Sequence, residues 1–133
     1  MANSINQFFK ENRKNRENIF VPVSKRFVDD KGEALKWELR PIPSNRLDKI
    51  RARAIGKDGN LDSTQFGLML TAASVVDPNL NDTKLQDSYG VKKAEDLLYE
   101  LMYWDELLAL EAAVIKLNGL DESLPDLVEQ VKN

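Results

Sequence analysis

Acidic and amide side chains in the segment Asp58–Asp62 (DGNLD) could hold a divalent cation. Their oxygens stand at alternate positions, as they do at the start of a calcium-binding loop. A complete loop of that type needs glycine at its sixth position and a bidentate glutamate at its twelfth, and the chain has Ser63 and Met69 there. A connecting loop followed by a helix cap explains these residues better, so we expect no metal and no cofactor.

The residue types that most enzymes use for catalysis are scarce. The chain contains no histidine and no cysteine, so the commonest general base and the thiolate nucleophile are both missing. Acidic pairs such as Glu95–Asp96 and Asp105–Glu106 are adjacent in sequence, and adjacent residues point to different sides of a helix. A hydrolase that uses only carboxylates stays formally open. Because the sequence has no glycine-rich phosphate loop and no nucleophile motif, we expect that the protein is not an enzyme.

Basic residues are concentrated in the N-terminal part of the chain. Residues 1–57 contain 14 Lys/Arg and 7 Asp/Glu, whereas residues 58–133 contain 5 and 15. The densest basic segment has no interleaved aromatic residues that could stack on bases, so we expect no nucleic-acid partner and favour a solvated face or a contact with an acidic protein. A nucleic-acid-binding regulator is a competing class, and the opposite charges of the two parts leave self-association open. The basic residues of this segment are Arg46, Lys49, Arg51, Arg53 and Lys57.

The clearest β-signal lies in the N-terminal third. Val23–Val28 and Ala34–Arg40 alternate between apolar and polar residues, and Asp29–Gly32 between them has the composition of a turn. Pro22 places the start of this region at a sheet edge. We expect a β-hairpin with one buried face, to which the second strand contributes Leu35, Trp37 and Leu39.

Apolar residues at helical spacing dominate the rest of the chain. The predicted helices cover residues 4–15, 44–55, 62–76, 83–87, 92–102 and 107–117, and the tail after residue 120 has enough apolar residues for one more. The predicted fold is therefore mainly α-helical, a small α+β domain with one N-terminal antiparallel β-hairpin. We expect one domain over residues 1–133, made of an N-terminal helix and basic segment (1–17), the β-hairpin (18–42), a helical core (43–119) and a C-terminal tail (120–133).

The sequence predicts a soluble protein without membrane contacts. No apolar run approaches the ~20 residues that cross a bilayer. The N-terminal charges follow the apolar pair Phe8–Phe9, which is the reverse of a secretory signal. The absence of cysteine suits a reducing compartment, so we expect an intracellular protein.

The stretch DPNLNDTKLQDSYG, from Asp77 to Gly90, reads as a structural corner between two helices. Asp77–Pro78–Asn79 has the composition of a turn, and Leu80 is expected to enter the core. Asn81 or Asp82 can cap one short helix, which Gly90 ends by adopting a positive φ. Its aspartates are spaced five apart and do not converge on one helical face, which favours this reading over a catalytic loop.

The C-terminal half has more apolar residues than one narrow core stripe needs. The surplus could pack inside the core, or it could form a groove for an amphipathic client helix, which would bind through anchors at i, i+3 and i+4. An acidic rim of Asp96, Glu100, Asp105 and Glu106 would then favour a basic client. The candidate partner-binding residues are Leu97, Leu101, Tyr103, Trp104, Leu107 and Leu108.

Two long motifs resemble those of a known family. DPNLNDTKLQDSYGVKKAEDLL is similar to the mid-chain signature of the XkdN-like tail assembly chaperones of tailed phages and prophages. FFKENRKNRENIFVPVSKRFVDDKGEALKWELRPI resembles the opening of that family, with its short helix, basic run and hairpin. The resemblance extends over residues 8–119, and the two motifs occur in the expected order.

The resemblance implies a function without chemistry. Such chaperones bind the tape measure protein, a very long helical chain, keep it soluble and assist the tail tube protein in assembling around it. They leave before the virion is complete, so the expected location is the bacterial host cytoplasm and not the mature virion. The alternative is a structural tail component or adaptor protein that is retained in the virion. The resemblance assigns no individual client-binding residues.

Overall fold

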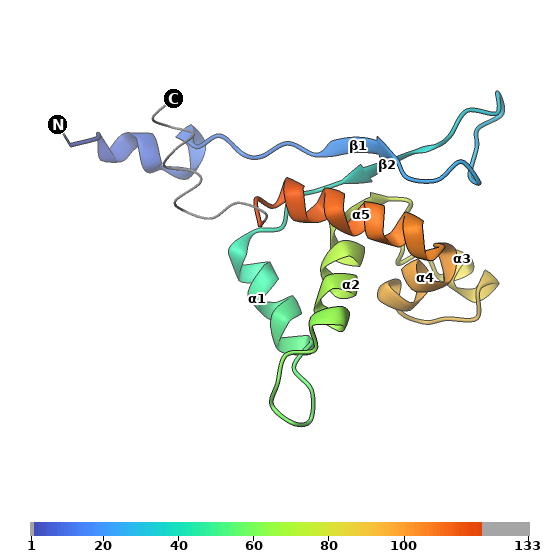
Figure 1. The fold of residues 1–133 in the computed structure, drawn as a ribbon. Coiled ribbons are helices and arrows are strands. Elements are labelled where there is room, and N and C mark those ends of the chain that lie inside the picture. The colour runs from blue at the N-terminus through green and yellow to red at the C-terminus, as the bar shows by residue number, and fades with distance from the viewer. Residues whose placement is uncertain (1, 121–133) are drawn as a thin grey trace.

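The computed structural model describes residues 2–120 (Figure 1). The helix that the sequence predicts after residue 120 lies outside the described residues. The fold is mainly helical with a small antiparallel sheet, which confirms the predicted α+β class. The elements are the 3₁₀ helices η1 (Ile5–Phe8) and η2 (Lys10–Asn12), the strands β1 (Ile19–Pro22), β2 (Lys36–Leu39) and β3 (Val75–Asp77), and the helices α1 (Ser44–Arg53), α2 (Ser63–Ser74), α3 (Thr83–Ser88), α4 (Ala94–Leu101) and α5 (Trp104–Leu117).

The sheet has three antiparallel strands in the order β1-β2-β3, so the hairpin is only part of it. The run DSTQFGLMLTAASVV predicts a helix through Val76, but the helix ends at Ser74 and the β-branched pair that follows forms β3. The Arg40 amide donates to the Ser74 carbonyl at 2.8 Å, which continues the join between β2 and the end of α2. The third strand was missed because its pairing partner is more than thirty residues earlier in the chain.

The first strand of the hairpin was placed too far along the chain. The sequence prediction used Val23–Val28, whereas the structure pairs Ile19–Pro22 with β2 and leaves only an isolated bridge at Val28. The Arg26 amide donates to the Ser24 hydroxyl at 3.1 Å in a turn that interrupts the ladder, and pairing resumes where the Leu35 amide donates to the Phe27 carbonyl at 2.9 Å. The edge position expected for this region is confirmed, since β1 is one of the two outer strands of the sheet.

The inner face of the sheet joins a single apolar core. Trp37 and Leu39 are buried as predicted, but Leu35 precedes β2 and is 45% exposed, so its predicted inward position was wrong. Helix α2 packs against α1, α4 and α5. In Figure 1, α5 lies below the sheet and runs along it. Among residues 2–120, no helix has the length and hydropathy that a membrane crossing requires.

The N-terminal segment is an arm that extends from the body (Figure 1). The predicted α-helix over residues 4–15 is replaced by η1 and η2, and neither contains a buried residue. Ile5 and Phe8 are 70% and 65% exposed. A short helix in water depends on tertiary packing of its apolar face, and this segment has little of it.

The corner between α2 and α4 matches its prediction. Leu80 is buried in the core, and the Asp82 carboxylate caps α3 by accepting from the Leu85 amide at 2.8 Å. Gly90 ends the corner with a φ of 70°. The sequence did not indicate the role of Gln86, whose buried amide donates to the Leu80 carbonyl at 2.8 Å and holds the corner closed.

Candidate peptide-binding site

An apolar groove lies where the hairpin meets the corner and α4. We name it the hairpin groove; its volume is about 340 Å³. Apolar side chains make up most of its surface, and a cis peptide bond joins Asp77 to Pro78 at its edge. The residues that line it are Phe27, Leu35, Lys36, Trp37, Asp77, Pro78, Leu85, Tyr89 and Leu101.

The floor and the walls of the hairpin groove differ in exposure. Trp37 and Leu101 are buried and form the floor. Leu35, from the hairpin, and Tyr89, which follows α3, are 45% and 40% exposed and form part of its walls. A concave apolar surface with a few polar groups at its edge is typical of a site that accepts apolar side chains of a ligand.

Arg26 connects the hairpin to the junction between α4 and α5. Its guanidinium lies 2.5 Å from the Glu106 carboxylate and donates to the Leu101 carbonyl at 2.7 Å. It also stacks over the rings of Phe27 and Tyr103, at 5.1 and 4.6 Å from their centroids. These contacts hold the Phe27 side of the hairpin groove against the end of α4.

Glu106 is the acidic partner in this connection. Its carboxylate also accepts from the Tyr103 amide at 2.9 Å, which satisfies a backbone donor at the start of α5. The hydrogen bond from Arg26, the largest cause, lowers the pKa of Glu106 to about 2. The carboxylate is therefore ionised at neutral pH, and the junction keeps its charge-assisted contacts.

The six candidate residues from the sequence divide into two groups of three. Leu97, Leu101 and Leu107 are buried in the core, and Leu101 alone also reaches the hairpin groove. The other three are exposed to solvent: Tyr103 by 66%, Trp104 by 71% and Leu108 by 45%. The structure therefore does not bring all six together on one open surface, and their role in binding a client stays a prediction.

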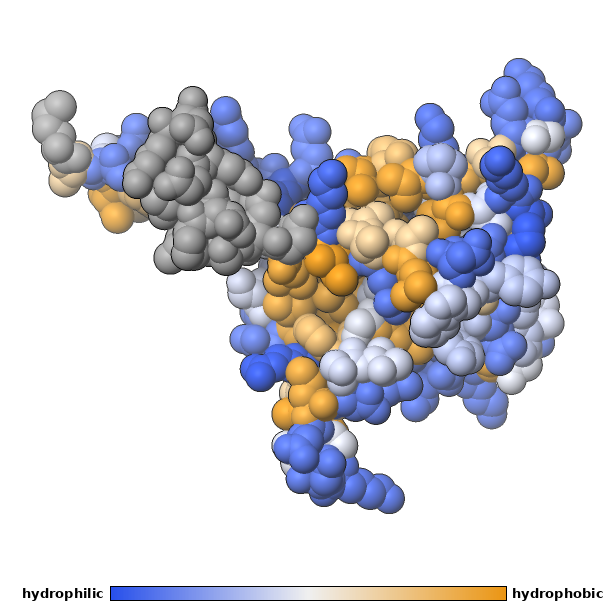
Figure 2. All heavy atoms as spheres, in the orientation of Figure 1, coloured by the Kyte–Doolittle hydropathy of each residue, from blue (hydrophilic) through white to orange (hydrophobic). Residues whose placement is uncertain are grey.

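A second, smaller hollow lies between α2, the end of α4 and the first half of α5. Its volume is about 180 Å³, and it includes Trp104 and Leu108 together with Tyr99, which is 61% exposed. Burial at this hollow raises the pKa of Glu111, an acidic residue at its edge. Figure 2 shows apolar side chains gathered over the outward face of α5.

The segment considered for calcium is a turn. The Asp58 carboxylate accepts from the Asn60 backbone amide at 3.0 Å and from its side-chain amide at 3.3 Å. These hydrogen bonds lower the pKa of Asp58. Within residues 2–120, no three acidic, histidine or cysteine side chains are grouped in a way that could hold a metal ion.

Sequence reasoning missed most of the hairpin groove. Phe27 and Leu35 were assigned to the hairpin only, and Leu85 and Tyr89 to the corner only. A signal was present, since the two family-like motifs contain every residue of the groove except Leu101. Two motifs far apart in the sequence can share one site only if the fold brings them together.

Comparison with known proteins finds relatives whose similarity extends over nearly the whole chain. A family model described as "Phage XkdN-like tail assembly chaperone protein, TAC" matches residues 5–132. The phage-like element PBSX protein XkdN of Bacillus subtilis (strain 168) is 29% identical over 126 residues, which cover 88% of this chain and 85% of that protein. The uncharacterized protein YqbN of the same strain is 27% identical with the same coverage. The crystal structure of the protein YqbN shares the fold, with a TM-score of 0.81 and 22% identity over 90% of this chain and 98% of that one.

Proposed function

Because the chain belongs to the family of phage XkdN-like tail assembly chaperones, we propose that it transiently binds the tape measure protein and assists assembly of the tail tube. Binding involves no chemical transformation of the client. It takes place in the cytoplasm of the bacterial host, before the virion is complete.

The observation that carries this proposal is the composition of the hairpin groove. Both motifs that resemble the family supply its lining, and two of its wall residues, Leu35 and Tyr89, are exposed despite being large and apolar. An amphipathic helix of the client would insert apolar side chains between these walls. The buried floor at Trp37 would give the inserted side chains an apolar contact surface.

The size of the groove suits a transient complex. A volume of about 340 Å³ holds only a few side chains. We expect a small interface with a polar rim and not a large obligate one, so the expected affinity is modest and release is fast. A chaperone that must leave its client during assembly requires such release.

The proposal is tested by coexpressing the chain with the tape measure protein of the same phage. The variant Leu35→Asp places a charge in the hairpin groove, and we expect it to lower the soluble yield of the client and its co-purification at least fivefold. Leu61→Asp is the matched control, because Leu61 is also a partly exposed leucine, by 39%, and lies outside the groove.

A third variant tests the candidate surface on α5. Leu108 has the same 45% exposure as Leu35, so Leu108→Asp makes an equal change at the other apolar hollow. Loss of client binding with Leu108→Asp and not with Leu35→Asp would show that the client binds at α5 and not in the hairpin groove. If the wild type neither raises the solubility of the client nor co-purifies with it, the proposed function itself is wrong.

A further inference from the structure

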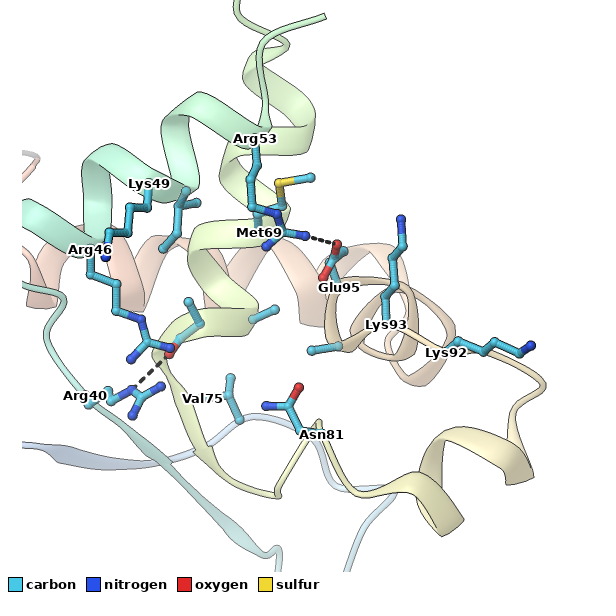
Figure 3. A pocket seen from close by; sticks show the side chains of 14 residues that line it. Arg40, Arg46, Lys49, Arg53, Met69, Val75, Asn81, Lys92, Lys93 and Glu95 are labelled. Carbon is cyan, nitrogen blue, oxygen red and sulfur yellow. Dashed lines mark hydrogen bonds and ion pairs between the residues drawn. The ribbon is translucent and has the colours of Figure 1, made fainter.

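A further concave surface, the basic cleft, lies between α1, α2 and the start of α4 (Figure 3). Its volume is about 440 Å³. Three separate parts of the chain supply its basic side chains: the residue after β2, helix α1 and the residues before α4. The basic side chains that line it are Arg40, Arg46, Lys49, Arg53, Lys92 and Lys93, and Glu95 is its one acidic residue.

The cations of the basic cleft are held close together. The half-buried Arg40 donates through Nε to the Ala73 carbonyl at 3.0 Å, which fixes its guanidinium at the cleft. Burial lowers the pKa of Arg40, and the nearby charge of Arg46 lowers it further. Arg46 extends from α1 toward Arg40 and Lys49 lies beside Arg46, whereas Lys92 points outward at the rim of the cleft (Figure 3). Like charges that line one cleft repel, so an anionic ligand would stabilise the arrangement.

Glu95 shows how the basic cleft accepts a carboxylate. Its side chain is only 9% exposed, and Arg53 donates to its Oε1 at 3.0 Å (Figure 3). This pair occupies one end of the cleft. In the described part of the chain, no comparable carboxylate pairs with Arg40, Arg46 or Lys49, which leaves that end with positive charge to be neutralised.

The floor of the basic cleft is apolar and has no aromatic residue. Ile50, Met69, Ala72, Ala73, Val75 and Ala94 contribute to its lining. Nucleic-acid sites that bind single strands combine basic groups with aromatic rings for the bases to stack on, and this cleft lacks those rings. An apolar floor below a basic rim instead matches a peptide that carries an apolar side chain between carboxylates.

We propose that the basic cleft binds an acidic polypeptide segment, with carboxylates at Arg40, Arg46 and Lys49 and an apolar side chain on the floor. The basic cleft and the hairpin groove have no lining residue in common. The protein would therefore have two binding surfaces of different chemistry, one for apolar helical segments and one for acidic segments.

The test uses a fluorescein-labelled peptide of about 12 residues that is rich in glutamate and has a central leucine. Fluorescence anisotropy should show binding at about 50 mM salt and weaker binding at about 300 mM, since screening reduces charge attraction. The double variant Arg46→Glu/Lys49→Glu reverses two exposed charges of the cleft and should weaken binding more than tenfold.

The matched control is Lys31→Glu/Lys57→Glu. It makes the same change in net charge at exposed residues outside the cleft, and we expect less than a twofold effect. Leu35→Asp should bind the acidic peptide as the wild type does, so failure of this inference can be told apart from failure of the proposed function. Equal losses in the two double variants, or no peptide binding at about 50 mM salt, would overturn the inference.

Two further measurements examine other occupants. If a single-stranded DNA of equal charge bound more tightly than the peptide and lost binding with Arg46→Glu/Lys49→Glu, the occupant of the cleft would be a nucleic acid and not an acidic peptide. Sedimentation of the chain alone would reveal a salt-sensitive oligomer. If the same double variant abolished that oligomer, the occupant would be the acidic part of a second copy, and the inference of a separate acidic partner would be wrong.

Discussion

Arg26 stabilises the edge of the hairpin groove through its contacts with other residues of the protein and is not itself proposed to contact a client. Its guanidinium binds Glu106 and the Leu101 carbonyl while it stacks over two aromatic rings. These residues come from the hairpin, the end of α4 and the start of α5, which have no regular hydrogen-bonding pattern in common. One charged side chain therefore joins three elements at the edge of the groove.

Replacing Glu106 with glutamine should make stability less dependent on pH. The folded-state pKa of Glu106 is about 2, below its ordinary value of 4.5, so its ionised form stabilises the folded state. The wild type should be more stable than Glu106→Gln above about pH 4.5, and the difference should shrink as the pH falls toward 2. Urea unfolding between about pH 7 and about pH 3 measures this.

The control for that experiment is Glu100→Gln, which changes an exposed glutamate on α4. We expect this variant to follow the wild type across the whole pH range. A stability loss in Glu106→Gln that stayed constant down to about pH 3 would show that the carboxylate acts by shape or polarity and not by charge.

The apolar residues of α4 and α5 show what residue type alone leaves open. Leu107 and Leu108 are adjacent leucines, and one is buried while the other is 45% exposed. The sequence showed a surplus of apolar residues in this half of the chain but not which of them would face α2 and the sheet. That choice depends on elements elsewhere in the chain, so the candidate site combined core residues with surface residues.

Helix α3 is the shortest α-helix of the described chain, and its ends are held by local contacts. Asp82 caps its first turn, and Gly90 ends the corner with a positive φ that suits glycine. The helix presents Leu85 to the hairpin groove. Because a helix of six residues has little stability of its own, the cap contributes to the shape of the groove.

Replacing Asp82 with alanine should therefore destabilise the protein by about 1 kcal/mol, the usual cost of losing an N-cap. Chemical denaturation measures the change. Asp87→Ala is the matched control, because it removes the same charge from an exposed position near the other end of the helix, and its effect should stay within about 0.5 kcal/mol. If both variants lost the same amount, the effect would come from net charge and not from the cap.

On the scale of the whole molecule, the hairpin groove and the basic cleft share one connection. Asp77 and Pro78 line the groove, and Val75 and Asn81 line the cleft. The connection between α2 and α3 therefore contributes to both surfaces. A protein arranged in this way could hold an apolar segment of one chain and an acidic segment of another at the same time.

The proposed function makes a prediction about the finished phage particle. A chaperone leaves its client before the virion is complete, so peptides of this chain should be absent from purified virions, or at least a hundredfold scarcer than those of the tail tube protein. Quantitative mass spectrometry of virions and of the infected-cell lysate gives both values. Stoichiometric amounts in the virion would identify a retained tail component or adaptor instead.

Local features of this protein were determined by the sequence alone. The cap of the short corner helix, expected from Asn81 or Asp82 and supplied by Asp82, the turn glycine Gly90 and the helix predicted over residues 92–102, which forms α4, are confirmed. Each depends on residues within a few positions of one another, and short-range hydrogen bonds and helical periodicity encode such features directly.

Only the tertiary structure decided which surfaces exist. It selected Ile19–Pro22 as the partner of β2, made β3 from the end of a predicted helix, and left Leu35 exposed at a groove made of two distant motifs. The physical reason is that burial and strand pairing depend on partners many residues away. A local pattern records that a side chain is apolar, but the rest of the fold decides whether that side chain enters the core or stays available to another chain.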